Sequence, residues 1–123
     1  MIISHHGVAP QIDPSAYIRQ SAHIIGDVHI GPESSIWFNA VVRGDVCYIR
    51  IGTRVNIQDT APVHVFSGGI PTILGEGVSI AHNVVVPACT IHNFTLVYCA
   101  APRSLAILFR TSAASAAPGM SSK

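Results

Sequence analysis

Residues Ile18 to Val42 read IRQSAHIIGDVHIGPESSIWFNAVV, and in this stretch an aliphatic residue returns at every sixth position. The positions are Ile18, Ile24, Ile30, Ile36 and Val42. A period of six matches neither the 3.6-residue period of an α-helix nor the simple alternation of an amphipathic strand. Six residues are enough for one short strand and one tight corner. We therefore expect three such units to close one triangular coil around inward-pointing aliphatic side chains.

The same period continues along the chain after two changes of phase and one interruption. The later positions are Ile51, Ile57, Val63, Leu74, Ile80, Val86, Ile91 and Val97. Glycine follows the aliphatic residue at Gly31, Gly52 and Gly75, where it relieves crowding at a corner. A repeat unit of this size buries its inner face only against its neighbours, so several coils are needed for stability. The sequence therefore predicts an all-β protein of stacked parallel coils.

Two segments depart from the repeat. The segment Phe66–Thr72, FSGGIPT, contains turn-forming glycines and a proline, and we expect it to be a loop extruded from a corner. Residues 98–123 contain no hexads. The charge changes there as well, from four basic and six acidic residues up to Val97 to three basic residues and no acid after it. We therefore predict a β-helix domain, 1–97, and an irregular, divergent tail, 98–123. A change of reading frame or of exon is our hypothesis for the change in composition, charge and period near residue 97.

Composition excludes several classes of protein. Of the 123 residues, 49% are hydrophobic and only 11% are charged, which argues against a disordered chain. A formal net charge of +1 implies no general attraction to nucleic acid or to membranes. Three cysteines without metal-like spacing indicate a reducing compartment. No secretory leader or membrane span is apparent, so we expect a cytoplasmic protein, with an organelle matrix as the alternative.

Two further strings carry a resemblance to a known family. The segment Arg43–Val65, RGDVCYIRIGTRVNIQDTAPVHV, resembles the signature of γ-class carbonic anhydrases and their relatives, which are also called hexapeptide-repeat transferases or ferripyochelin-binding proteins. The segment Ser79–Ile91, SIAHNVVVPACTI, is similar to the second metal-binding string of this family. The resemblance implies a left-handed parallel β-helix, a homotrimer, and reversible hydration of carbon dioxide to bicarbonate by zinc-bound hydroxide.

The resemblance also implies a set of metal ligands. In the family, three histidines from two subunits hold zinc at each subunit interface. His64 and His82 match two of these positions, but Pro87 stands at the third. A catalytic zinc needs three protein ligands and a water molecule, so we expect weakened metal binding and impaired activity. The alternatives are iron or cobalt as the metal, and Cys89 or His92 as the replacement ligand.

Other polar positions match the family as well. Asn56 and Gln58 correspond to residues beside the zinc-bound water, and Gln58 is our candidate for orienting that water. Asp59 is a candidate for accepting a hydrogen bond from the histidine ring nitrogen that does not bind the metal. Arg43 and Asp45 resemble a pair that forms salt bridges between subunits.

Three functions are consistent with these residues. The first is carbonic anhydrase activity, impaired at the position of Pro87. The second is a non-catalytic trimeric scaffold or assembly subunit, which needs Arg43 and Asp45 but no complete zinc site. The third is acyl transfer, because hexapeptide β-helices are common among acyltransferases; this rests on analogy of fold alone.

Overall fold

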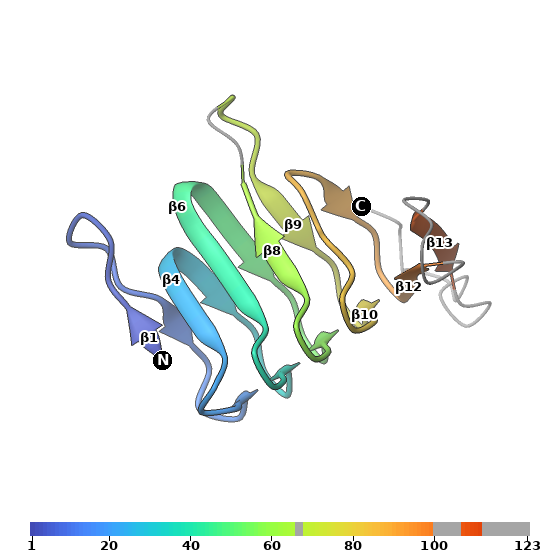
Figure 1. Ribbon diagram of the computed structural model, residues 1–123, viewed down its shortest axis with the longest axis horizontal. Coiled ribbons are helices and arrows are strands. Elements are labelled where there is room, and N and C mark those ends of the chain that lie inside the picture. Colours follow the sequence, from blue (N-terminus) through green and yellow to red (C-terminus); the bar gives the residue numbers. More distant parts are fainter. Residues whose placement is uncertain (66–67, 100–106, 112–123) are drawn as a thin grey trace.

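The structure is a computed structural model of the 123-residue chain, and it describes residues 1–65, 68–99 and 107–111. Every regular element in these residues is a strand, and the coils lie side by side along the long axis of the molecule (Figure 1). The strands are β1 (Ile2–Ile3), β2 (Gln11–Ile12), β3 (Tyr17–Ile18), β4 (His23–Ile30), β5 (Ser35–Ile36), β6 (Val41–Ile51), β7 (Asn56–Ile57), β8 (Pro62–His64), β9 (Thr72–Leu74), β10 (Ser79–Ile80), β11 (Thr90–Ile91), β12 (Thr95–Cys99) and β13 (Ile107–Thr111).

Pairing between successive coils builds two sheets. The first has the order β1-β4-β6-β9-β11, with β2 also paired to β4 and β8 to β6. The second has the order β13-β12-β10-β7-β5-β3. The ladder between β12 and β13 is antiparallel, whereas the other ladders between named strands are parallel. The long strands β4 and β6 pass through a corner and contribute to two sides of the coil, while the second sheet forms the third side.

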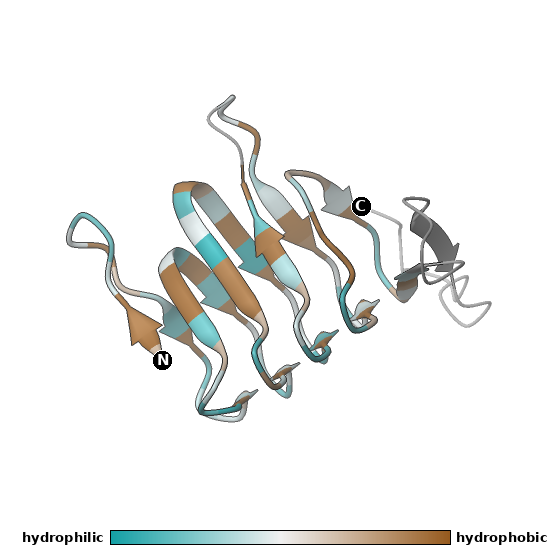
Figure 2. Cartoon of the chain, in the orientation of Figure 1, coloured by the Kyte–Doolittle hydropathy of each residue, from teal (hydrophilic) through white to brown (hydrophobic). Residues whose placement is uncertain are grey.

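The predicted hexad residues stack in three inward columns, apart from Ile18, which pairs with Ile36 at the N-terminal end and is only partly buried. These columns are Ile24, Val42, Val63 and Val86; Ile30, Ile51, Leu74 and Ile91; and Ile36, Ile57, Ile80 and Val97. Each of these side chains is at most 4% exposed, and burying one contributes roughly 1.5–3 kcal/mol. Buried and partly exposed residues accordingly alternate along β4. Figure 2 shows bands of hydrophobic and hydrophilic residues along the coils. The predicted left-handed parallel β-helix of hexapeptide repeats is confirmed.

An insertion at one corner explains the first change of phase. Gly26 pairs with Gly44, and Val28 pairs with Ile49, so one residue of β4 lies opposite residues 45–48 of β6. The extra residues form a bulge outside the coil while the inward columns stay aligned. The hexad spacing therefore breaks in the sequence although the stacking continues in space.

The predicted loop and tail are described only in part. Residues 68–71 lie outside the strands, as expected for a loop, but Thr72 is the first residue of β9 and is fully buried. Strand β13 lies within the predicted tail, where it adds an antiparallel strand to β12 without continuing the hexads. The loop residues 66–67 and the tail residues 100–106 and 112–123 are outside the described residues, and the division of the chain at residue 97 stays a prediction. Within the described ranges, no helix has the length and apolar character needed to cross a bilayer.

Candidate metal centre

His64 and Pro87 lie next to each other on adjacent coils. Val63 is bridged to Val86 in parallel, so the residues that follow them, His64 and Pro87, are also neighbours. The backbone N–H of His64 donates to the carbonyl oxygen of Val86 over 3.1 Å. Because Val63 and Val86 point into the core, the alternation of a strand directs the next side chains outward. Arg43 pairs with His64 on the preceding coil, so Arg43, His64 and Pro87 form one outward column.

Thr72 fixes the backbone of this pair. Its hydroxyl lies 3.1 Å from the carbonyl oxygen of His64 and 3.3 Å from that of Pro87. The residue is fully buried at the start of β9. One hydroxyl therefore ties together the two positions where the resemblance places metal ligands.

His82 lies at a corner, away from this column. The corner is built where Asn39, Thr60 and Asn83 adopt left-handed backbone on successive coils, with φ of 59°, 62° and 63°. Asn83 donates its backbone N–H to Asp59, and Thr60 donates its hydroxyl to the amide oxygen of Asn83. His82 immediately precedes Asn83, so this corner holds the imidazole on the exposed rim of the coil.

Gln58 is the residue that contacts the ring of His82. Its Oε1 atom lies 3.2 Å from Nδ1 of His82. In the tautomer that carries a proton on Nδ1, the ring donates to Gln58 and keeps the lone pair of Nε2 for another partner. The predicted role of Asp59 in holding a histidine ring stays a prediction. Asn56 donates to the hydroxyl of Ser35 over 2.7 Å, a contact between coils.

Arg43 and Asp45 form an ion pair within the chain. Nη2 and Nε of Arg43 lie 2.8 and 3.3 Å from Oδ2 of Asp45. The hydrogen bond from Arg43 is the main cause that holds the pKa of Asp45 below its usual range, against the opposing effect of burial. The other carboxylate oxygen, Oδ1, is buried and has no hydrogen-bond partner among the described residues. The predicted salt bridge between subunits stays a prediction.

The described residues of one chain do not bring three metal-binding side chains together. In residues 1–65, 68–99 and 107–111, no three His, Cys, Asp or Glu side chains cluster closely enough to hold a metal ion. The ring of Pro87, which stands beside His64, has no atom that could bind a metal. Cys89 is packed against the core, and burial raises the pKa of its thiol. His92 follows β11 and lies in register with Gly75, away from the side of the coil that carries Pro87.

Known proteins similar to this chain include several carbonic anhydrases, although no protein-family model matches it. Gamma carbonic anhydrase 1, mitochondrial, of Arabidopsis thaliana is 46% identical over 94 residues, which are 72% of this chain and 34% of the relative. The carbonic anhydrase of Geobacillus kaustophilus is 44% identical over 97 residues, 79% of this chain and 53% of the relative. The probable carbonic anhydrase of Methanocaldococcus jannaschii is 50% identical over 86 residues, 70% and 54% of the two chains.

Solved structures show the same architecture. A hexapeptide transferase family protein from Anaplasma phagocytophilum has a TM-score of 0.73 at 41% identity, covering 77% of this chain and 55% of that one. A putative acetyltransferase from Bacillus cereus has a TM-score of 0.57 at 26% identity, covering 92% and 84%. The chain spans between about a third and about half of the length of its curated relatives. Over the residues that align, the resemblance predicted from the sequence is confirmed: the chain is similar to gamma carbonic anhydrases and to hexapeptide transferase family proteins.

Proposed function

We propose that this chain is a γ-carbonic anhydrase-like subunit whose hydration of carbon dioxide is impaired at the metal site. The main support is the outward column in which Pro87 stands beside His64. With His82, the chain retains two of the three imidazoles that the resemblance implies. Dividing the roughly 10–16 kcal/mol of a four-ligand zinc site evenly, one lost ligand costs about 3 kcal/mol. That is about a hundredfold in affinity.

The placement of the two histidines also supports a homotrimer. His64 lies on a flat side of the coil and His82 lies at a corner, held by Gln58. A single ion would therefore meet imidazoles from two copies of the chain. A side-to-corner contact is heterologous, and repeated around a triangular rod it closes as a ring of three. We propose the cytoplasm or an organelle matrix as the compartment; the Arabidopsis relative is named mitochondrial.

The substitution Pro87→His tests the proposed site. We expect the wild-type oligomer to bind well under one zinc per chain and the variant about one, because the new imidazole would stand beside that of His64. Val85→His is the matched control, since Val85 is 47% exposed, precedes Pro87 by two residues and lies beside Pro62 instead. Metal analysis, oligomer mass and carbon dioxide hydration are measured for each protein, with cobalt and iron loading as further arms.

The outcomes separate the functions. Restored zinc with restored hydration supports the impaired enzyme. Restored zinc without hydration favours the second candidate, a non-catalytic trimeric scaffold, which the Arg43–Asp45 ion pair and Pro87 both allow. Unchanged zinc in Pro87→His shows that this position is not the missing ligand. Acyl transfer has the weakest support, since the likeness to the Bacillus cereus protein concerns the fold.

A further inference from the structure

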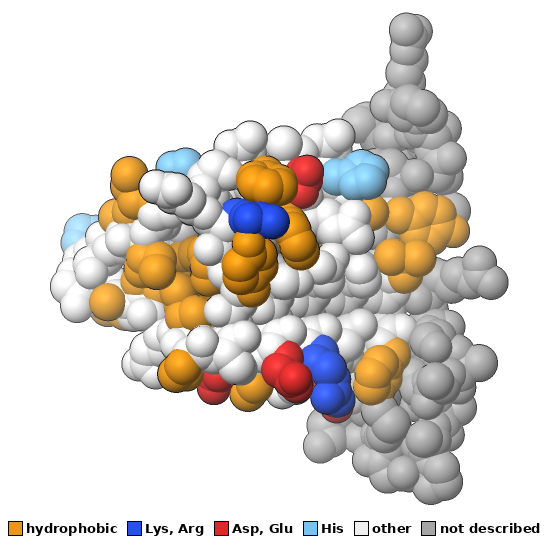
Figure 3. Space-filling model, turned by 90° about the horizontal axis from the view of Figure 1, so that it is seen from below, with side chains coloured by type: hydrophobic (Ala, Val, Ile, Leu, Met, Phe, Trp, Pro, Cys, Tyr) orange, Lys and Arg blue, Asp and Glu red, His pale blue; other side chains and the backbone are white. Residues whose placement is uncertain are grey.

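Arg19 is surrounded by three aromatic rings on the side formed by the second sheet. Its guanidinium carbon lies 4.8 Å from the ring centre of Tyr17, 5.0 Å from that of Trp37 and 4.6 Å from that of Phe38. Figure 3 shows a basic side chain among hydrophobic side chains on this face. We call these four residues the Arg19 cluster. Tyr17 and Phe38 are 46% and 45% exposed, so the cluster is open to solvent.

The charge of Arg19 is not neutralised by any described residue. Arg43, Arg50 and Arg54 each have a carboxylate oxygen within 3.0 Å. Arg19 has no such partner in the described ranges, and its buried Nε atom lacks a hydrogen bond there. A cation held against apolar groups without a counter-charge is costly. An anion bound at the outer edge of the guanidinium would offset part of that cost.

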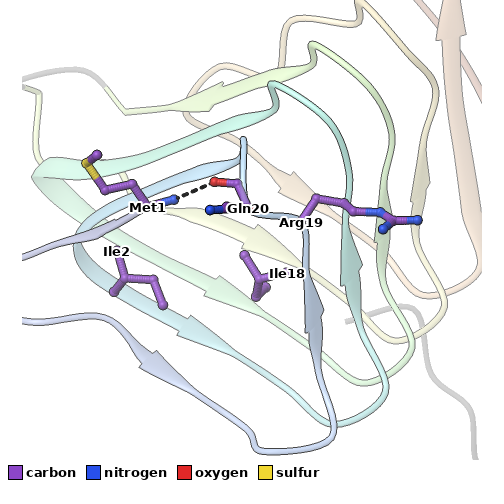
Figure 4. Close-up of a pocket in the computed structure, with 5 residues that line it drawn as sticks. All are labelled: Met1, Ile2, Ile18, Arg19 and Gln20. Carbon is purple, nitrogen blue, oxygen red and sulfur yellow. Dashed lines mark hydrogen bonds between the residues drawn. The ribbon is translucent and has the colours of Figure 1, made fainter.

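The orientation of Arg19 suits a ligand from solvent. A pocket at the N-terminal end of the coil is lined by Arg19 together with Met1, Ile2, Ile18 and Gln20. Figure 4 shows the guanidinium of Arg19 extending away from Ile2 and Ile18. A guanidinium presents parallel N–H groups that match two oxygens of a planar carboxylate-like anion. The aromatic rings beside it attract the guanidinium through their π faces and so hold it in place.

The cluster lies on the same side of the coil as Gln58. Arg19, Trp37 and Gln58 occupy equivalent positions, since the backbone N–H of each donates to the hexad isoleucine of the next coil. At about 4.8 Å between neighbouring strands, Arg19 is about 10 Å from Gln58 along the axis. Gln58 in turn contacts His82. An anion at Arg19 would thus lie two coils from Gln58 and three coils from His82.

We propose that the Arg19 cluster binds a small planar oxyanion of the carboxylate class. That this anion is bicarbonate rests on the proposed function, because bicarbonate is the product of carbon dioxide hydration. The cluster would hold bicarbonate at the surface, on the same side of the coil as Gln58 and two coils from it. Binding itself needs neither a metal nor turnover.

Trp37 gives a direct readout, because it is the only tryptophan of the chain. Its fluorescence is followed in the full-length oligomer during titration with sodium bicarbonate, acetate or chloride at constant pH and ionic strength. We expect a saturable change with bicarbonate and acetate and none with chloride. Arg19→Met should raise the half-saturation concentration at least about tenfold, equivalent to about 1.4 kcal/mol. Arg54→Met, which removes a paired arginine at another corner, should leave it unchanged.

The controls keep the two proposals separate. Arg19→Lys retains the charge but not the planar arrangement of N–H groups, so this variant should bind the anion with intermediate strength. It replaces Arg19→Met in the comparison if Arg19→Met does not fold. An equal response to chloride, or a response that persists in Arg19→Met, would overturn the anion site. A Trp37 signal that depends only on protein concentration would show that a second copy covers the cluster, which also overturns it. Acetate binding with unchanged zinc in Pro87→His would support the anion site and reject the proposed metal site.

Discussion

Gly44 lies against the backbone of Asp27 on the neighbouring coil. A Cβ atom at Gly44 would come within 2.6 Å of the carbonyl oxygen of Asp27 and 2.9 Å of its carbonyl carbon. Both are backbone atoms of a paired strand, so they cannot move aside independently. The close approach occurs at the corner where the bulge of residues 45–48 begins. A glycine is therefore required there by space and not by its backbone conformation.

We predict that Gly44→Ala lowers the free energy of unfolding by about 1–3 kcal/mol, the usual cost of overpacking. Gly68→Ala is the control, because no atom lies within 4 Å of a Cβ at that position; it should change stability by less than about 0.5 kcal/mol. Denaturant unfolding of both variants measures the difference. Equal stabilities would show that the corner can relax.

Asp45 gives a residue-scale prediction on pH. Its pKa in the folded chain is lowered from 3.8, mainly by the hydrogen bond from Arg43. A depressed folded-state pKa contributes stability above the unfolded value, and this contribution is lost as the pH falls through the folded value. We therefore expect the stability advantage of the wild type over Asp45→Asn to be constant from about pH 7 to pH 5 and to shrink below about pH 4. Unfolding midpoints of both proteins at several pH values test this, and a constant difference down to about pH 2.5 would contradict it.

At the scale of elements, β9 attaches the loop after β8 to the coil. Thr72, at its start, is buried and donates its hydroxyl between the carbonyl oxygens of His64 and Pro87. The sequence pattern assigned Thr72 to the loop, because the glycines and proline before it are turn-forming. The structure places it in the strand, since parallel pairing with Ile49 begins at this residue.

We predict that Thr72→Val costs about 0.5–1.5 kcal/mol, the net value of one lost hydrogen bond. The volume stays nearly the same, so packing should not add to this cost. Thr90→Val is the control, because Thr90 begins β11 and is exposed. Denaturant unfolding compares the two, and the same small effect in both variants would mean that the hydroxyl of Thr72 contributes nothing.

The molecule as a whole is a stack of coils, and its last described coil is covered on one side only. Within the described residues, β11 is the last strand of the first sheet and β12 is covered by β13 on the second. An uncovered parallel strand presents unpaired N–H and C=O groups that can pair with another chain. Each coil is stabilised by its neighbours, so a coil with one neighbour is the least stable part of the stack.

We therefore predict that the isolated 123-residue chain melts below about 60 °C, within the range of ordinary domains, and associates as its concentration rises. Calorimetry gives the melting temperature, and light scattering gives the association. A cooperative transition well above that temperature, without any growth in particle mass, would show that the ends are adequately covered.

The sequence by itself determined the coil, because a six-residue aliphatic period has few other ways to bury its apolar side chains. It also identified His64, His82 and Pro87 as the informative positions, through the resemblance of the surrounding strings. Only the tertiary structure placed Pro87 beside His64 and Gln58 against His82, and it alone showed the Arg19 cluster. These contacts join residues on different coils. Their register depends on insertions and corners between the repeats, which the period does not specify.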